Sequence, residues 1–304
     1  MLNGGSRKGR RKWVSPYCAG GETRADDGMA YTDTDNAESK KDGVTPGAAD
    51  ENVFAPVRED VALLLLSALA AFVDTAGFIA LYGLFIAHMT GNIVVAGLFL
   101  ANEHPKSVLI RLGVVPVFMV AVAGASLFAR WVRRRNGCVL SLLLRCEAVA
   151  LLAFLIAGTL WGGRVQGGEN EELLFLLAIP GVAAMGIQNL LTKYSLGQQT
   201  PTTIMTGNLV QWTISGTLLL WHRLSPHRFD ATEEIQTARR QFARMNFVLA
   251  GFLLGASAGA AGIIFFGFPS LLVPVLIAMV LAVTSEMAHY KRNAQGKLVR
   301  DGGC

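Results

Sequence analysis

Charged residues are scarce in this sequence. They account for 16% of its 304 residues, whereas hydrophobic residues account for 52%. An average soluble domain carries about 25% charged residues. The shortage excludes an intrinsically disordered protein, which combines high charge with little apolar surface. It also counts against a soluble enzyme, because such a composition leaves too little polar surface to cover the core.

Cysteines are few, and the common catalytic motifs are missing. Cys18, Cys138, Cys146 and Cys304 form no CxxC pair and no Cys/His cluster with zinc spacing. We therefore expect neither a disulfide framework nor a metal site. The sequence has no Walker loop, no GxSxG elbow, no HExxH motif and no dinucleotide-binding fingerprint. We expect no cofactor and no enzymatic activity.

Long hydrophobic runs take the place of these features. A helix that crosses a bilayer needs about 20 mostly apolar residues. Eight apolar segments lie near residues 61–82, 84–101, 108–131, 139–161, 173–194, 203–221, 242–266 and 270–288. We predict an all-α integral membrane protein with a membrane domain over residues 61–288. A polar tail over residues 1–60, which we expect to be disordered, precedes it, and a basic tail over residues 289–304 follows.

An internal repeat is visible in the membrane domain. The sequence Met-Thr-Gly-Asn occurs at residues 89–92 and again at residues 205–208. Gly-Ala-Ser occurs at residues 124–126 and 255–257, in the third and seventh segments. Because the order of features is the same in both halves, we predict two copies of one module, over residues 61–162 and 173–288.

The loop charges favour six full spans over eight. Basic residues follow segments three, six and eight, whereas the loop after segment four is acidic. Cytoplasmic loops are enriched in Lys and Arg. If segments 84–101 and 203–221 enter the bilayer and return, every basic loop and both termini lie on the cytoplasmic side. The two modules would then be inverted, as in many secondary transporters. Eight spans remain the alternative, because segment 84–101 with its flanks is nearly long enough to cross.

The basic residues flank apolar runs, so we interpret them as determinants of topology and expect no nucleic-acid partner. The partners implied are the lipid bilayer and a small solute or a proton. The sequence leaves open whether the chain forms a homo-oligomer.

The two Met-Thr-Gly-Asn segments are the first candidates for a site. Irregular backbone at membrane depth is tolerated where it is buried in protein or lines a wet cavity. Two such breaks in corresponding positions predict a central site. Side chains that could bind a solute or cation there are Thr90, Asn92, Thr206 and Asn208. The alternative is structural: each Asn caps a half-helix and each Gly permits close packing.

Ionisable and amide side chains in the apolar segments are further candidates. Asp74 lies near the middle of the first segment, where a charge is costly, so we predict a role as proton carrier or cation ligand. His88 lies beside the first motif and could titrate near neutral pH. Gln188 and Asn189 lie on two different faces of the fifth segment, and both are candidates for a substrate or ion path. For all four, hydrogen bonding between helices is the structural alternative.

Two other features concern packing. Gly251, Gly255 and Gly259 repeat every four residues, a pattern that lets helices approach closely. Glu147 lies inside the fourth segment and needs a partner that the sequence does not name. Arg145, two residues away, is on a different face of the helix.

Residues 72–78 (Phe-Val-Asp-Thr-Ala-Gly-Phe) and 85–92 (Phe-Ile-Ala-His-Met-Thr-Gly-Asn) resemble the YoaK family. Residues 184–189, followed by Thr206-Gly207-Asn208, look like the second signature of that family. The resemblance covers residues 61–288 and implies a polytopic protein of the bacterial inner membrane with a domain of unknown function. It supplies no substrate. The N-terminal tail is longer than is usual in the family, and a start at Met29 is one explanation.

Together these patterns predict a small-solute transporter or permease, with a central site at the two Met-Thr-Gly-Asn segments. The alternative is a membrane scaffold or sensor in which the polar residues only hold helices together.

Overall fold

The computed structural model describes residues 59–101, 105–135, 137–168, 170–195, 205–224 and 232–301. The predicted N-terminal tail, apart from Glu59 and Asp60, and the alternative start at Met29 lie outside this part of the chain.

The described residues form eight α-helices and two short 3-10 helices, with no strand among them. In chain order they are α1 (Glu59–Ala80), α2 (Met89–Ala101), α3 (Pro105–Arg134), α4 (Val139–Trp161), η1 (Gly162–Gly168), α5 (Glu171–Ser195), α6 (Met205–Leu224), α7 (Thr232–Phe266), η2 (Phe268–Leu271) and α8 (Leu272–Asp301). The prediction of an all-helical protein is confirmed.

Six of the described helices are long and apolar enough to cross a membrane: α1, α3, α4, α5, α7 and α8. With 13 residues, α2 is about 20 Å long, too short for a hydrocarbon core of about 30 Å. Large apolar side chains are exposed along these helices, among them Met119, Leu127, Leu160, Leu253 and Phe265. Lipid rather than water suits such a surface.

Several helix ends differ from the predicted segments. The second segment was expected to begin near residue 84, but α2 begins at Met89, because residues 81–88 form a non-helical loop. Helix α7 begins about three turns before the predicted residue 242, in a polar stretch that hydropathy could not mark. Helix α8 continues to Asp301, through most of the residues predicted as a basic tail.

Charged residues complement several helix ends. Glu59 and Asp60 begin α1, and acidic pairs also begin α5 and α7. Arg133 and Arg134 lie in the last turn of α3. Negative charge near a helix N-terminus and positive charge near its C-terminus stabilise the helix dipole.

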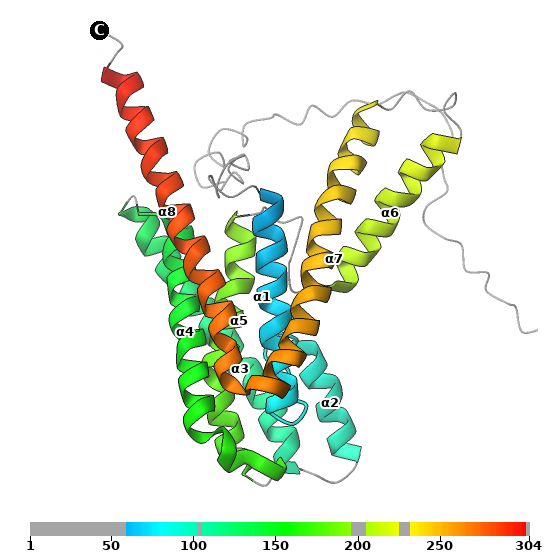
Figure 1. Ribbon diagram of the computed structural model, residues 1–304, viewed down its shortest axis with the longest axis vertical. Helices are drawn as coiled ribbons and strands as arrows, with labels where there is room; N and C mark the ends of the chain where they lie inside the picture. Colours follow the sequence, from blue (N-terminus) through cyan, green and yellow to red (C-terminus); the bar gives the residue numbers. More distant parts are fainter. Residues whose placement is uncertain are drawn as a thin grey trace, which may run out of the picture. The chain divides into compact units, whose positions relative to one another are not determined.

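Helices α1 and α7 run side by side in the same direction (Figure 1). Gly251, Gly255 and Gly259 of α7 lie directly against the backbone of Leu64, Ala68 and Phe72 of α1. A Cβ atom at any of these glycines would collide with α1 backbone atoms. The three glycines therefore provide the close helix contact that small residues allow in membranes.

A second parallel pair is formed by α3 and α5. Gly113 of α3 faces the ring of Phe175, and Gly186 of α5 lies against Phe118 and Ala121. Helix α4 packs against both α5 and α8, while α2 lies on α3 and α6 lies on α7. In Figure 1, α2 runs toward the end of the bundle where α1 ends.

Candidate functional site

The Asp74 side chain is held by the loop that follows its own helix. Its Oδ1 accepts hydrogen bonds from the backbone N–H groups of Ile86, at 2.8 Å, and Ala87, at 2.6 Å. Its Oδ2 lies 2.5 Å from Nδ1 of His88. Asp74 is only 6% exposed. Three donors thus surround a carboxylate that would be costly to bury alone.

Asn92 of α2 binds the same loop. Its Oδ1 accepts a hydrogen bond from the N–H of Phe85 at 2.9 Å, and its Nδ2 donates to the Phe85 carbonyl at 2.8 Å. Asn92 is fully buried in the first turn of α2. The structural alternative expected Asn92 to cap a helix. Instead, its side chain pairs with the backbone of Phe85.

The chain turns sharply at Tyr82 and Gly83, which have φ angles of 52° and 81°. Glycine adopts this left-handed region readily, whereas tyrosine does so at a cost. Because Asp74 lies six residues before the end of α1, its bonds to residues 86–88 bring the loop about 9 Å back along the helix. The glycine at position 91 leaves room for the ring of Phe85, which a Cβ would meet at 2.9 Å.

Arg111 of α3 binds the turn, a role that was not predicted from the sequence. Its Nη2 donates to the Tyr82 carbonyl at 3.0 Å, and its guanidinium lies 4.2 Å from the centre of the Phe99 ring. Arg111 is only 6% exposed. Nearby, the hydroxyl of Ser107 donates to Glu171 at the start of α5. The available signal was an arginine a few residues inside an apolar segment, which is costly without partners.

His88 lies where the loop meets α7. Its ring centre is 5.9 Å from that of Phe85 and 6.3 Å from that of Phe252, both at steep angles. About a third of the side chain, 32%, is exposed. The hydrogen bond to Asp74 raises the pKa of His88, while burial acts in the opposite direction. Asp74 and His88 form the one pair of titratable candidates that the described structure brings together.

The remaining candidates are distributed over other helices. Both Met-Thr-Gly-Asn motifs form the first turn of a helix, α2 or α6. Asn208 is buried like Asn92, whereas Thr90 and Thr206 are exposed. The loop that precedes α6 lies outside the described residues.

On α5, Gln188 and Asn189 point to different partners. Gln188 donates to the Leu66 carbonyl of α1 at 2.7 Å, while Asn189 donates to the Met185 carbonyl of its own helix at 2.9 Å. Gln188 is fully buried and Asn189 is partly exposed. The two amides therefore do not share one face.

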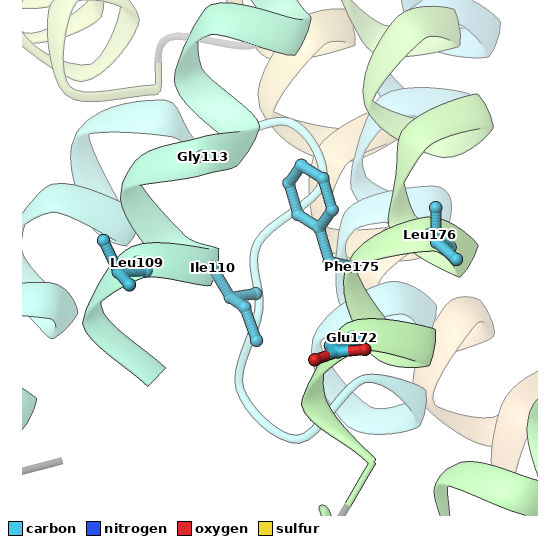
Figure 2. Close-up of a pocket in the computed structure, with 6 residues that line it drawn as sticks. All are labelled: Leu109, Ile110, Gly113, Glu172, Phe175 and Leu176. Carbon is cyan, nitrogen blue, oxygen red and sulfur yellow. The ribbon is translucent and has the colours of Figure 1, made fainter. Parts of the chain in front are cut away.

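A pocket of about 350 Å³ opens between α3 and α5 (Figure 2). Apolar side chains and one carboxylate surround it: Leu109, Ile110, Gly113, Glu172, Phe175 and Leu176. This lining offers a polar solute few hydrogen bonds, so we do not assign the candidate site to it.

The chain matches the family model DUF1275, described as a protein of unknown function, over residues 62–284. The chain belongs to this family. The matched region contains Asp74, His88, Asn92 and both Met-Thr-Gly-Asn motifs. No curated protein and no solved structure matches the chain. The family and the six apolar helices together identify a membrane-type helical protein whose family has no assigned function.

Proposed function

We propose that this DUF1275 protein is a permease for a small solute, with its central site beside the loop of residues 81–88. The carrying observation is the Asp74 site: non-helical backbone is folded back into the helix bundle and bound there by buried side chains. In membrane proteins, irregular backbone at depth is characteristic of solute and ion sites.

Asp74 and His88 supply the chemistry for coupling in this proposal. A carboxylate and an imidazole 2.5 Å apart share a proton readily, and His88 is partly exposed. Release of that proton would remove the charge on His88 and weaken its hold on the loop. Thr90, Asn189, Thr206 and Asn208 are proposed to line the solute path.

The proposed two-fold repeat is supported by the pairing of the helices. If α1 corresponds to α5 and α3 to α7, then the parallel pairs α1–α7 and α3–α5 are the same contact made twice. The packing of α2 on α3 corresponds in the same way to that of α6 on α7. Helices α2 and α6 would then be the re-entrant elements of two inverted modules.

The proposed location is a bacterial inner membrane with both termini in the cytoplasm. Arg244, twelve residues into α7, pairs with Glu59 at the start of α1. Cys138, directly before α4, contacts the carbonyl of Ser285 in the middle of α8. These contacts bring the basic segments to one end of the bundle, which supports the positive-inside orientation. The YoaK name and the absence of enzymatic activity remain predictions.

A second candidate function, a membrane scaffold or sensor, is favoured by a different observation. Asn92 uses its two groups on the Phe85 backbone, and Asp74 binds only the loop and His88. Side chains whose polar groups are used in this way could have a purely structural role.

Reconstituted liposomes distinguish these functions. The full chain is reconstituted with a self-quenching internal dye, and volume recovery is followed after a hyperosmotic step with glycerol, urea or glycine. A permease speeds recovery for at least one of these solutes relative to protein-free liposomes. Recovery at the protein-free rate for all of them refutes the permease and leaves the scaffold.

The variant Asp74→Asn tests coupling in the same liposomes. Asparagine keeps an oxygen for the N–H groups of Ile86 and Ala87 but removes the charge that faces His88. We expect the variant to fold and to lose the pH dependence of solute entry. Wild-type pH dependence in Asp74→Asn would exclude Asp74 from coupling.

A further inference from the structure

Glu147 is the most deeply buried carboxyl group among the described residues. It lies on α4, eight residues from the start of that helix and so about 12 Å along its axis. Its exposed fraction is 0%, and neither carboxylate oxygen has a hydrogen-bond partner within the described chain. A buried carboxylate with no donor is costly, so this group requires a positive partner or a proton.

The register of α4 and α5 brings Gln188 to the same level. These helices are joined by a short connection and run antiparallel, with Gly181 against the ring of Phe154. Glu147 lies seven residues before Phe154, and Gln188 lies seven residues after Gly181. Seven residues are close to two full turns, so both side chains stay on the facing surfaces.

The packing of the interior supports this register. The buried apolar residues form two clusters. On each helix, the boundary between the two clusters lies at a single position. It falls between Leu144 and Ala148 on α4 and between Met185 and Leu190 on α5. Glu147 and Gln188 therefore occupy a polar layer between two apolar clusters.

On α1 the same division falls between Leu66 and Leu69. The buried Ser67 lies at this boundary and therefore belongs to the same polar layer.

Each donor side chain of this layer binds a backbone carbonyl of a neighbouring helix. Ser67 donates to the Val248 carbonyl at 2.7 Å, and the Nε2 of Gln188 donates to the Leu66 carbonyl at 2.7 Å. Three acceptors remain without partners in the described chain: Oε1 and Oε2 of Glu147 and Oε1 of Gln188. An all-acceptor set of this kind is suited to a small cation.

We propose that Glu147 and Gln188 form a buried binding site for one small monovalent cation, either H⁺ or Na⁺. A proton on Glu147 would supply a donor for the Gln188 oxygen, whereas Na⁺ would be coordinated by all three oxygens. The site is separate from Asp74, whose carboxylate is already satisfied by three donors. It does not depend on the proposed transport of a solute.

The other charged groups on the packed helices are engaged or lie at helix ends. On α8, Glu286 pairs with Arg145 of α4, and His289 lies close to it in the last part of the helix. On α5 the acids Glu171 and Glu172 lie at the opposite end. Arg130 of α3 is exposed, and Arg164 belongs to η1 beyond the far end of α4. A change in the occupancy of the site therefore reflects Glu147 itself.

Carbodiimide labelling of the purified full chain tests the site. Dicyclohexylcarbodiimide dissolves in detergent micelles and adds to a protonated carboxyl group, and rearrangement then gives a stable N-acylurea with no leaving group. Peptide mass spectrometry locates the adduct. We expect Glu147 to be labelled, with yield falling as pH rises, and Glu147→Gln to lose that adduct.

Two further measurements test the role of Gln188 and identify the cation. Gln188→Leu removes the facing oxygen and should shift the pH at which labelling of Glu147 is half-maximal. Protection by NaCl but not by choline chloride identifies Na⁺, whereas equal labelling in both salts identifies H⁺. An unlabelled Glu147 in protein that elutes as a single folded species, or an unchanged pH profile in Gln188→Leu, would overturn the site.

Discussion

The side-chain amide of Asn92 and the backbone of Phe85 form a closed pair of hydrogen bonds, at 2.9 and 2.8 Å. The amide thus substitutes for a neighbouring strand or helical turn and satisfies both polar groups of a buried loop residue. This pair gives a physical reason for the asparagine of the first Met-Thr-Gly-Asn motif: it fixes the loop of residues 81–88.

Replacing Asn92 should destabilise the protein more than replacing its neighbour in the same turn. Asn92→Ala leaves the N–H and carbonyl of Phe85 without partners, and we expect a loss of about 2–4 kcal/mol in the free energy of unfolding. Thr90→Ala, at an exposed position, is the control. Denaturant titration in detergent measures both variants, and equal stability of the two would contradict the role of Asn92.

The Asp74–His88 bond should make stability depend on pH. Because the folded-state pKa of His88 is raised above 6.5, the bond contributes fully below pH 6.5 and is lost as pH rises through the folded-state value. We therefore expect the melting temperature of wild type to exceed that of His88→Gln most at low pH, with the difference shrinking toward alkaline pH. A difference that does not change with pH would show that the charge on His88 is unimportant.

The two Gly-Ala-Ser sequences offer a matched pair of glycines. A Cβ at Gly255 would collide with the backbone of Ala68, whereas a Cβ at Gly124 meets nothing within 4 Å. We expect Gly255→Ala to cost about 1–3 kcal/mol through overpacking. Gly124→Ala should stabilise α3 by up to about 1 kcal/mol, because alanine favours helix. The order of the two melting temperatures tests this, and the reverse order would contradict the α1–α7 contact.

Arg111 should control the mobility of the loop rather than that of the bundle. Arg111→Lys keeps the charge but loses the planar group that both reaches the Tyr82 carbonyl and covers Phe99. Hydrogen–deuterium exchange should speed up in peptides that contain residues 81–88 and stay unchanged in peptides from α7. Faster exchange throughout the chain would instead indicate a general loss of stability.

Thiol labelling decides between six and eight spans. Four crossings separate Arg135 from Lys291 if α2 and α6 are re-entrant, and five if every segment crosses. In a background without native cysteines, Arg135→Cys and Lys291→Cys should therefore behave alike toward an impermeant maleimide in intact cells, and Arg164→Cys should behave oppositely to both. Opposite labelling at positions 135 and 291 would establish that one more segment crosses.

The sequence alone determined the helical class and the main elements. Apolar runs of sufficient length specify helices in any environment without water, because only internal hydrogen bonds can satisfy the backbone there. The ends of α4 at residues 139 and 161 agree with its apolar segment. The start of α7 and the end of α8 do not, because helical backbone continues into polar residues that hydropathy does not mark.

The tertiary structure decided what the polar residues do. The sequence marked Asp74, His88 and Asn92 as costly in lipid, but only the reversal of the chain at Tyr82 and Gly83 brings them to one loop. For Arg111 and Glu147 as well, the sequence marks a costly charged residue but does not identify its partner. Arg111 finds its partner 29 residues away in the chain. Glu147 finds none among the described residues, and only the register of α4 and α5 brings Gln188 to its level. The partners of such residues depend on how the helices pack, and the local periodicity of the sequence does not predict that packing.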